Sequence, residues 1–352
     1  MTTHERVTRM FQHKEADRVP ITDWPWQGTL RRWVREGMPA EADWREYLDI
    51  DKFEGFHMDV SPRYTKEILE DTPEYTIEKT SFGVTLKQLK KEDATPEFLD
   101  FHVNDPARWA EAKARMIPSP DRIDFAKWEN NYAKWRKADS WIQGNFWFGF
   151  DATHSWMTGT ETLLIAMMED PEWVDDMFEH MLKMNMALYS MLWDRGMKFD
   201  SVFWCDDMGY KGTQFFSLNK YREISKKYHK IAIDWAHERG IYAHLHSCGM
   251  VEPFIPDLIE IGLDGLNPLE VKAGMNPRGL KAKYGDKLLL HGGVNAVLWD
   301  KEEEIEEELR RVVPVLKENG GYIFASDHSI PSSVSLDSMK RIVWLVKELG
   351  KY

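Results

Sequence analysis

A histidine and a cysteine separated by a single residue, His246 and Cys248, stand directly after an apolar run in this chain. On an extended strand the side chains at positions i and i+2 point to the same face, so these two donors would share one side. The chain has only two cysteines in 352 residues, which makes the position of this one notable. The spacing indicates either two ligands of a metal ion or a buried thiol beside a hydrogen-bonded histidine, and the motif alone favours neither.

Further polar residues end the neighbouring predicted strands and extend the set of potential donors. Thiolate, imidazole and carboxylate together suit a zinc ion. Each residue also has a structural interpretation: the acids could cap a loop, Glu270 could pair with Lys272, and His291 could be a core histidine. His328 suits metal ligation, general acid catalysis or binding of a ligand carboxylate. The candidates at successive strand ends are Asp206, Asp207, His246, Cys248, Glu270, His291, Asp327 and His328.

Sixteen tryptophans give the chain an unusual aromatic content. Tryptophan buries a large area and stacks on flat ligands. Packing in the core or at a subunit interface is the alternative for each of them, and clustering at one end of a barrel would favour ligand binding. The tryptophans near predicted strand ends are Trp24, Trp26, Trp147, Trp156 and Trp204.

The elements that must hold these residues alternate strand and helix through the C-terminal half. Parallel strands joined by crossover helices produce this rhythm. Glycines at 262 and 285 mark two helix ends. We expect strands over residues 201–207, 242–248, 265–270, 287–293 and 320–328, and helices over 219–239, 252–261, 278–284, 301–319 and 336–349.

The N-terminal half has a looser pattern. It predicts strands over 17–24, 53–60 and 141–148, an inserted hairpin over 75–89 that turns at Gly83, and a helical insertion over 105–131. Eight strands, each followed by a helix or an insertion, predict an α/β fold: a single (β/α)8 TIM barrel with N-terminal helical and hairpin insertions. We expect one domain over residues 1–352. Catalytic groups of this fold sit at the C-terminal ends of the strands.

Composition excludes several classes of partner. The formal net charge of −13 disfavours binding to nucleic acid and to anionic membranes. The polar N-terminus does not resemble a signal peptide, and no apolar run reaches the roughly 20 residues that cross a bilayer. Two cysteines fit a reducing compartment, so we expect a cytoplasmic protein. The phosphate-binding glycine patterns and the Gly-x-Ser-x-Gly elbow are absent, which disfavours nucleotide-dependent chemistry and serine hydrolysis.

The chain resembles the uroporphyrinogen decarboxylase family, and within it the cobalamin-linked methyltransferases. The resemblance extends over nearly the whole chain and is strongest from about residue 200 onward. Its segments are residues 5–20, Glu169-Asp170-Pro171-Glu172, His246-Ser-Cys248-Gly249, Gly262-Leu-Asp264, Gly274-Met-Asn, Lys283-Tyr-Gly285, Gly292-Gly293 and Gly320-Gly321. Membership implies a (β/α)8 barrel and allows a homodimer.

Two departures separate the chain from its relatives. True decarboxylases carry an Arg-Gln-Ala-Gly-Arg segment that binds the propionates of the tetrapyrrole, and residues 23–32 lack it. The methyltransferases hold zinc with His-x-Cys and a later cysteine. His246 and Cys248 match the first pair, but the later cysteine is absent and His328 stands at about its place. The resemblance to ether-cleaving methyltransferases implies Glu and His ligands, for which Glu270 and His291 are the candidates.

The resemblance therefore implies a zinc-dependent O-demethylase type of methyltransferase. It would move a methyl group from a small methylated substrate, expected to be a methoxylated aromatic, to the Co(I) corrinoid of a partner protein. Zinc with one thiolate is a stronger Lewis acid than zinc with two, which suits an ether oxygen. We expect Asp206, Asp207 or His328 to act on the leaving oxygen, and substrate to bind Asp23, Trp24, Trp26, Trp147 and Trp204. The alternatives are methyl transfer from a corrinoid to a thiol, decarboxylation of another acid, and non-catalytic binding of a corrinoid or tetrapyrrole.

Overall fold

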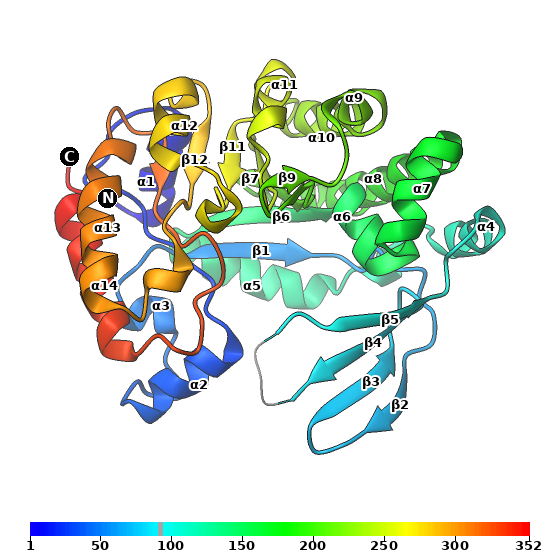
Figure 1. The fold of residues 1–352 in the computed structure, drawn as a ribbon, viewed down its shortest axis with the longest axis horizontal. Helices are drawn as coiled ribbons and strands as arrows, with labels where there is room; N and C mark the ends of the chain where they lie inside the picture. The colour runs from blue at the N-terminus through cyan, green and yellow to red at the C-terminus, as the bar shows by residue number, and fades with distance from the viewer. Residues whose placement is uncertain (91–93) are drawn as a thin grey trace.

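A parallel sheet of seven strands forms the centre of the computed structural model, which describes residues 1–90 and 94–352 (Figure 1). Every neighbouring pair in this sheet is parallel. Each predicted barrel strand from residue 53 onward is present, although all seven are shorter than expected. In spatial order the strands are β1 (Phe53–His57), β6 (Trp141–Trp147), β7 (Ser201–Cys205), β10 (Tyr242–His246), β11 (Gly265–Asn267), β12 (Leu289–His291) and β13 (Tyr322–Ile323).

The predicted first strand closes the barrel through a single bridge instead of a regular ladder. Ile21 forms a parallel bridge with Phe324, just after β13. On its other side, the Ile21 carbonyl accepts a hydrogen bond from the Asp51 amide at 2.9 Å, just before β1. Prolines at 20 and 25 lack an amide hydrogen, which explains why this segment forms so few ladder bonds. These contacts confirm the predicted (β/α)8 barrel.

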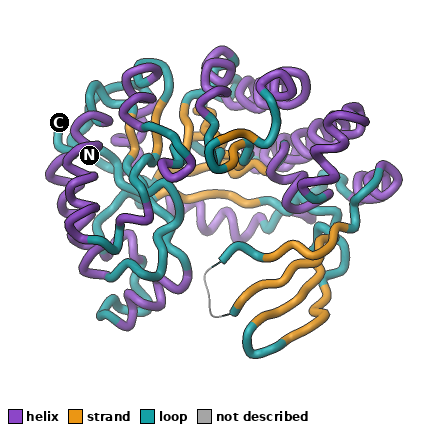
Figure 2. Tube along the Cα trace, viewed as in Figure 1, coloured by secondary structure: helices purple, strands orange, loops and turns teal. Residues whose placement is uncertain are grey.

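Helices cover the outside of the sheet, as the alternating pattern predicts (Figure 2). The longest, α8, begins where Asp170 caps its first turn and a proline occupies the first helical position. The longer helices are α4 (Pro106–Arg115), α5 (Phe125–Lys137), α7 (Thr160–Glu169), α8 (Pro171–Asp194), α10 (Lys226–His237), α13 (Glu302–Leu316) and α14 (Leu336–Leu349). Shorter ones are α2 (Gln27–Arg35), α3 (Trp44–Tyr47), α6 (Phe150–Thr153), α9 (Leu218–Lys220), α11 (Ile255–Glu260) and α12 (Pro277–Tyr284).

The N-terminal helix α1 (Thr3–Phe11) closes the bottom of the barrel. Its buried face, which includes Phe11, packs against Trp141 at the start of β6 and Leu289 at the start of β12. Phe11 also stacks on Tyr242 at the start of β10, with ring centroids 4.4 Å apart. Helix α1 therefore covers the N-terminal ends of the strands. The predicted site residues lie at the opposite, C-terminal ends.

The inserted hairpin is part of a four-stranded antiparallel sheet beside the barrel (Figure 1). Its central pair turns at Gly83, as predicted, where a positive φ of 85° suits glycine. Two flanking strands, which sequence patterning did not reveal, complete the sheet. Phe82 next to this turn contacts Trp147 at the end of β6. The strands are β2 (Glu67–Asp71), β3 (Tyr75–Lys79), β4 (Val84–Leu89) and β5 (Glu97–Phe101).

The predicted helical insertion over 105–131 forms two helices, α4 and α5, separated by a loop that contains Pro118 and Pro120. Proline at these positions interrupts helical hydrogen bonding. No helix among the residues that the structure describes is long and apolar enough to cross a membrane.

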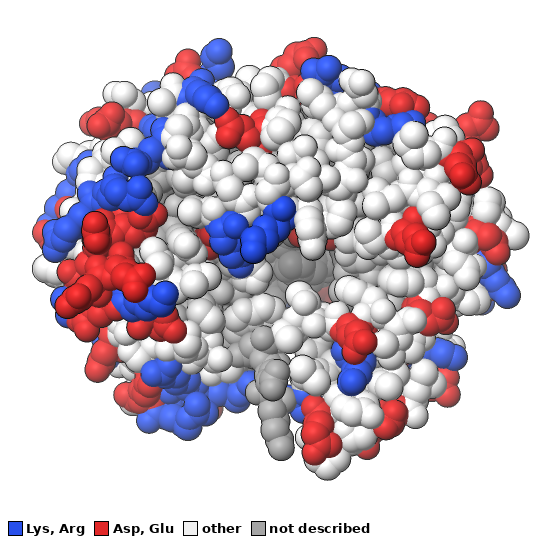
Figure 3. All heavy atoms as spheres, viewed as in Figure 1, with Lys and Arg blue, Asp and Glu red and all other residues white. Residues whose placement is uncertain are grey.

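The predicted acidic helix, α13, contributes most of the acidic cluster at the left of Figure 3. Three glutamates occupy its first turn, where the helix dipole favours negative charge. Glu302 and Glu306 both pair with Arg341 of α14. These ion pairs connect the last two barrel helices, so the cluster has a structural explanation.

Candidate metal centre and active site

Four adjacent strands bring one residue each to the same level near the open end of the barrel. Trp147 of β6 pairs in register with Cys205 of β7, Cys205 pairs with His246 of β10, and His246 pairs with Asn267 of β11. Because parallel strands end at the same edge, the loops that follow them converge above this row. The candidate site lies in those loops.

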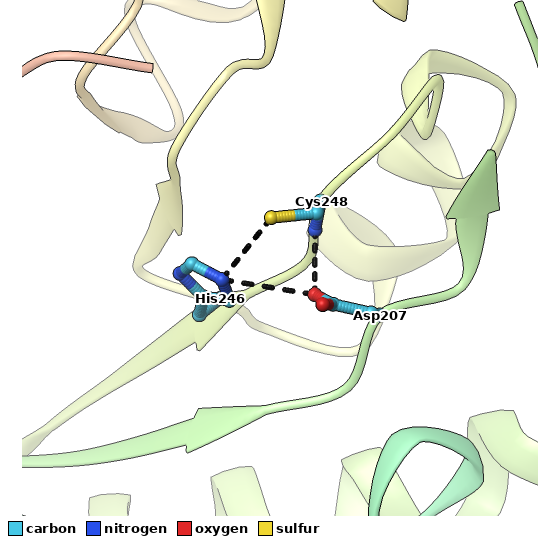
Figure 4. Close-up of side chains that lie close together, drawn as sticks. All are labelled: Asp207, His246 and Cys248. Carbon is cyan, nitrogen blue, oxygen red and sulfur yellow. Dashed lines mark hydrogen bonds and ion pairs between the residues drawn. The ribbon is translucent and has the colours of Figure 1, made fainter. Parts of the chain in front are cut away.

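Three potential metal ligands meet just above the row. Asp207, His246 and Cys248 each offer one donor atom, and these atoms all lie within 4.8 Å of one another. The Cys248 sulfur is 3.4 Å from His246 Nε2, which is 3.7 Å from Asp207 Oδ1. Asp207 Oδ1 also accepts a hydrogen bond from the Cys248 amide at 2.7 Å. Figure 4 shows the three side chains turned toward one another. His246 and Cys248 thus share one face, as their spacing predicts.

Asn267 determines which nitrogen of His246 faces this cluster. Its amide nitrogen lies 3.2 Å from the His291 carbonyl oxygen, which can only accept, so the amide oxygen points the other way. That oxygen lies 2.5 Å from His246 Nδ1, which must therefore donate. The neutral imidazole then presents an unprotonated Nε2 to Cys248 and Asp207. Metal-binding histidines are commonly oriented by such a partner.

The electrostatics of the cluster favour a cation. Burial, followed by the charges of Asp207 and Glu270, holds the pKa of the Cys248 thiol well above its ordinary value. A metal ion reverses this balance, because it stabilises thiolate and carboxylate together. One thiolate, one imidazole and one carboxylate form a three-ligand set that suits catalytic zinc with an open fourth position. The residues present therefore fit the predicted metal, with Asp207 in place of a second cysteine.

The other two predicted metal ligands lie outside this group of three. Glu270 accepts a hydrogen bond from the Gly249 amide at 2.7 Å, so it holds the loop that carries Cys248. His291 is fully buried inside the barrel, where its ring centroid is 5.2 Å from that of His244. Burial keeps the pKa of His291 well below its ordinary value. Sequence reasoning placed both residues at strand ends but could not rank their distances from Cys248.

Asp206 and Asp207 are consecutive acids with opposite surroundings. Asp206 is fully buried, and its two oxygens are taken by the Asp151 amide and by His229 Nε2, each at 2.8 Å. His229 Nδ1 in turn lies 3.1 Å from the Tyr221 hydroxyl. This chain connects α6, which follows β6, to α10 and to the helical segment that precedes it. The structure therefore turns Asp206 away from the cluster that Asp207 joins.

The remaining polar candidates lie in loops at the rim. His328 is exposed, and its ring centroid is 6.3 Å from that of Trp26. Asp23 is buried and accepts hydrogen bonds from both the amide and the hydroxyl of Ser326, each at 2.8 Å. Burial raises the pKa of Asp23 to about 7. Asp327 is fully buried and accepts from the amides of Val271 and Ala296, so it ties the rim loops together.

A pocket of about 500 Å³ lies beside the three potential ligands, since its lining residue Cys205 pairs in register with His246. Five of its thirteen lining residues are tryptophan or phenylalanine. Of the predicted substrate-binding tryptophans, Trp24 and Trp147 line this pocket, whereas Trp204 is fully buried and stacks on Phe148 instead. The lining residues are Trp24, Phe53, Glu54, Gly55, His57, Met58, Gln143, Asn145, Phe146, Trp147, Asn185, Phe203 and Cys205.

Sequence reasoning missed two residues of this site, Asn267 and Asp151. Asn267 is the last residue of β11, directly before a proline, and a polar residue at a strand end was the available signal. Asp151 follows β6 by four residues, inside a short helical turn. No motif distinguishes it in the sequence, and its importance depends on neighbours from distant segments.

Comparison with known proteins agrees with this architecture. The family model for uroporphyrinogen decarboxylase (URO-D) matches residues 152–349, more than half of the chain. A methyltransferase from Methanosarcina mazei has a similar structure, with a TM-score of 0.68, 15% sequence identity and 99% coverage of both chains. A D-psicose 3-epimerase solved with D-fructose matches at a TM-score of 0.32 and 11% identity, over 64% of this chain and 83% of the other. No curated protein matches. The chain belongs to the uroporphyrinogen decarboxylase family.

Proposed function

We propose that this protein is a metal-dependent methyltransferase that moves a methyl group from a small methoxylated aromatic to the corrinoid of a partner protein. The cluster of Asp207, His246 and Cys248 is the observation that carries the proposal. The structurally similar protein from Methanosarcina mazei is a methyltransferase, which supports the reaction class. The missing Arg-Gln-Ala-Gly-Arg segment argues against porphyrinogen decarboxylation.

The three ligands suit activation of an ether oxygen. Zinc bound here would act as a Lewis acid that polarises the oxygen and eases departure of the methyl group. A single thiolate donates less charge to zinc than two would, so the ion keeps more of its Lewis acidity. Asn267 holds the imidazole of His246 in the orientation that ligation requires. Zinc held by these three residues would have room to bind the substrate oxygen as a further ligand.

The aromatic pocket supplies binding for a flat substrate. Trp24, Phe53 and Trp147 line it, and aromatic rings favour offset or edge contacts with another ring. A volume of about 500 Å³ lies within the range of small-molecule sites. A ring bound here would lie next to Cys205, and its methoxy group would point toward His246. The pocket therefore suits one substituted aromatic ring better than a tetrapyrrole.

Metal analysis and a direct assay test the proposal. We expect purified protein to hold one zinc ion per chain, and Cys248→Ala to lose it while the exposed-site control Asn130→Ala keeps it. Zinc protein mixed anaerobically with Co(I) cobalamin and methoxylated aromatics should produce the absorbance of methylcobalamin. Chelation of zinc should abolish the signal.

Three results would contradict the proposal. Zinc content that does not change in Cys248→Ala removes the cluster as the metal site. Methyl exchange driven by free thiols but not by ethers assigns the reaction to corrinoid-to-thiol transfer. Decarboxylation of uroporphyrinogen by the metal-free protein assigns it to the decarboxylases.

A further inference from the structure

We propose that Asp151 is the general acid that protonates the oxygen from which the methyl group departs. This inference rests on the proposed function and assigns to that reaction a residue that no sequence motif marks. In the step, the bond between the methyl carbon and the oxygen breaks and its electron pair stays on the oxygen. The methyl carbon bonds to the nucleophilic cobalt of the partner's corrinoid. The proton of the Asp151 carboxyl passes to the oxygen, which leaves a hydroxyl product and an Asp151 carboxylate that solvent reprotonates.

The position of Asp151 connects the two halves of the site. Trp147, a lining residue of the aromatic pocket, donates a hydrogen bond from Nε1 to Asp151 Oδ2 at 3.3 Å. On the other side, the Asp151 amide donates a hydrogen bond to Asp206 Oδ1 at 2.8 Å, and Asp206 directly precedes Asp207 of the cluster. Asp151 is not within the group of three potential ligands. A carboxyl beside the ligands and beside the substrate pocket suits proton delivery to an oxygen held between them.

The surroundings of Asp151 favour its protonated form. Its side-chain contacts are long: 3.3 Å to Trp147 Nε1, 3.4 Å to Ser155 Oγ and 3.7 Å to His154 Nε2. Among the described residues, no lysine or arginine forms an ion pair with it. Burial is the main cause that raises the pKa of Asp151 above its ordinary value.

A buried hydrogen-bond chain holds the backbone of Asp151 in place. The Asp151 amide donates to Asp206 Oδ1, and Asp206 Oδ2 contacts His229, whose second nitrogen contacts Tyr221. Asp206, His229 and Tyr221 are all at most 1% exposed. Burying these polar groups costs desolvation free energy, and a fully hydrogen-bonded buried chain is rigid. It therefore suits a role in positioning Asp151. It also explains why a fully buried acid directly precedes the ligand Asp207.

The other candidates for the acid are less well placed. Both oxygens of Asp206 already have partners, Asp207 belongs to the ligand cluster, and His328 is exposed beside Trp26. Asp151 is half-buried, contacts Trp147 of the pocket and has no strong partner. Of these carboxyls, it is the one best placed to give a proton.

Asp151→Asn tests the proposal, with Asp234→Asn on the exposed face of α10 as the matched control. The assay uses methyl aryl ethers whose phenol products differ in acidity. We expect a loss of about 10²- to 10⁴-fold in rate for ethers of weakly acidic phenols. A nitrophenyl methyl ether should lose far less, because its leaving oxygen needs no proton. Zinc content and thermal stability should match those of the control.

A second measurement does not depend on turnover. Difference infrared spectroscopy of the zinc-loaded protein at pH 7 should show a protonated carboxyl band that is missing in Asp151→Asn. An equal loss of rate across the ether series, no loss at all, or the absence of that band would overturn the assignment while leaving methyl transfer intact. A wild-type protein that is inactive toward every ether would overturn both the proposed function and this role.

Discussion

Replacement of Asn267 by leucine should weaken zinc binding without touching a ligand. The Asn267 amide oxygen lies 2.5 Å from His246 Nδ1, and its amide nitrogen is held 3.2 Å from the His291 carbonyl. Leucine has nearly the same volume but leaves the Nδ1 hydrogen without an acceptor, so the orientation of the imidazole is no longer fixed. Loss of such a partner typically lowers metal affinity by about 10- to 100-fold. This range corresponds to about 1.4 to 2.8 kcal/mol.

The size of the effect should lie toward the lower end of that range. The His246 side chain is 25% exposed, so water can partly replace the lost acceptor. The lost bond to the His291 carbonyl should also reduce the free energy of unfolding by about 1 kcal/mol.

Zinc affinity is best measured by competition with a chelator of known affinity, after chemical denaturation has shown that the variant is folded. Asn130→Leu on the exposed face of α5 is the control for the substitution itself. A folded Asn267→Leu protein with the zinc affinity of the wild type would refute the argument that Asn267 orients His246.

Three further predictions concern the loop of the site and one contact between α10 and the residue before β11. Gly249→Ala should destabilise the protein by more than about 1 kcal/mol and lower its zinc content. The reason is that Gly249 has a φ of 83° and an added Cβ would lie 2.1 Å from the Gly209 carbonyl carbon. Wild-type stability in urea would contradict this prediction. Glu270→Gln should reduce zinc affinity less than Cys248→Ser does. Glu270 lies outside the ligand group and accepts a hydrogen bond from the Gly249 amide. A complete loss of zinc would instead make Glu270 a ligand. The Asp264 hydrogen bond raises the pKa of His237 above 6.5, so the pair stabilises the fold below pH 6.5 and this contribution disappears as the pH rises through the raised pKa. His237→Gln should therefore lower the free energy of unfolding more at pH 5.5 than at pH 8.5, and an equal loss at both values would contradict the assignment.

Much of the barrel could be predicted from local patterns. Apolar runs of strand length alternate with amphipathic helical segments, and glycines and capping residues mark the boundaries. After residue 200, the helices therefore lie close to their predicted ranges, and the shorter strands fall within theirs. The first strand was harder to predict, because prolines reduce it to a single bridge at Ile21. The flanking strands of the inserted sheet were missed, because β2 is exposed along its whole length and has no buried face to produce alternation.

By itself, the sequence determined that His246 and Cys248 share a face and that acids end the preceding strand, because spacing along one strand decides which way neighbouring side chains point. Only the tertiary structure decided which of the strand-end residues come together. It placed Asp207 beside His246 and Cys248, turned Asp206 toward His229, and set His291 deep in the barrel. It also brought Asn267 and Asp151 to the site, because strand stagger and loop conformation are set by packing among segments far apart in the chain.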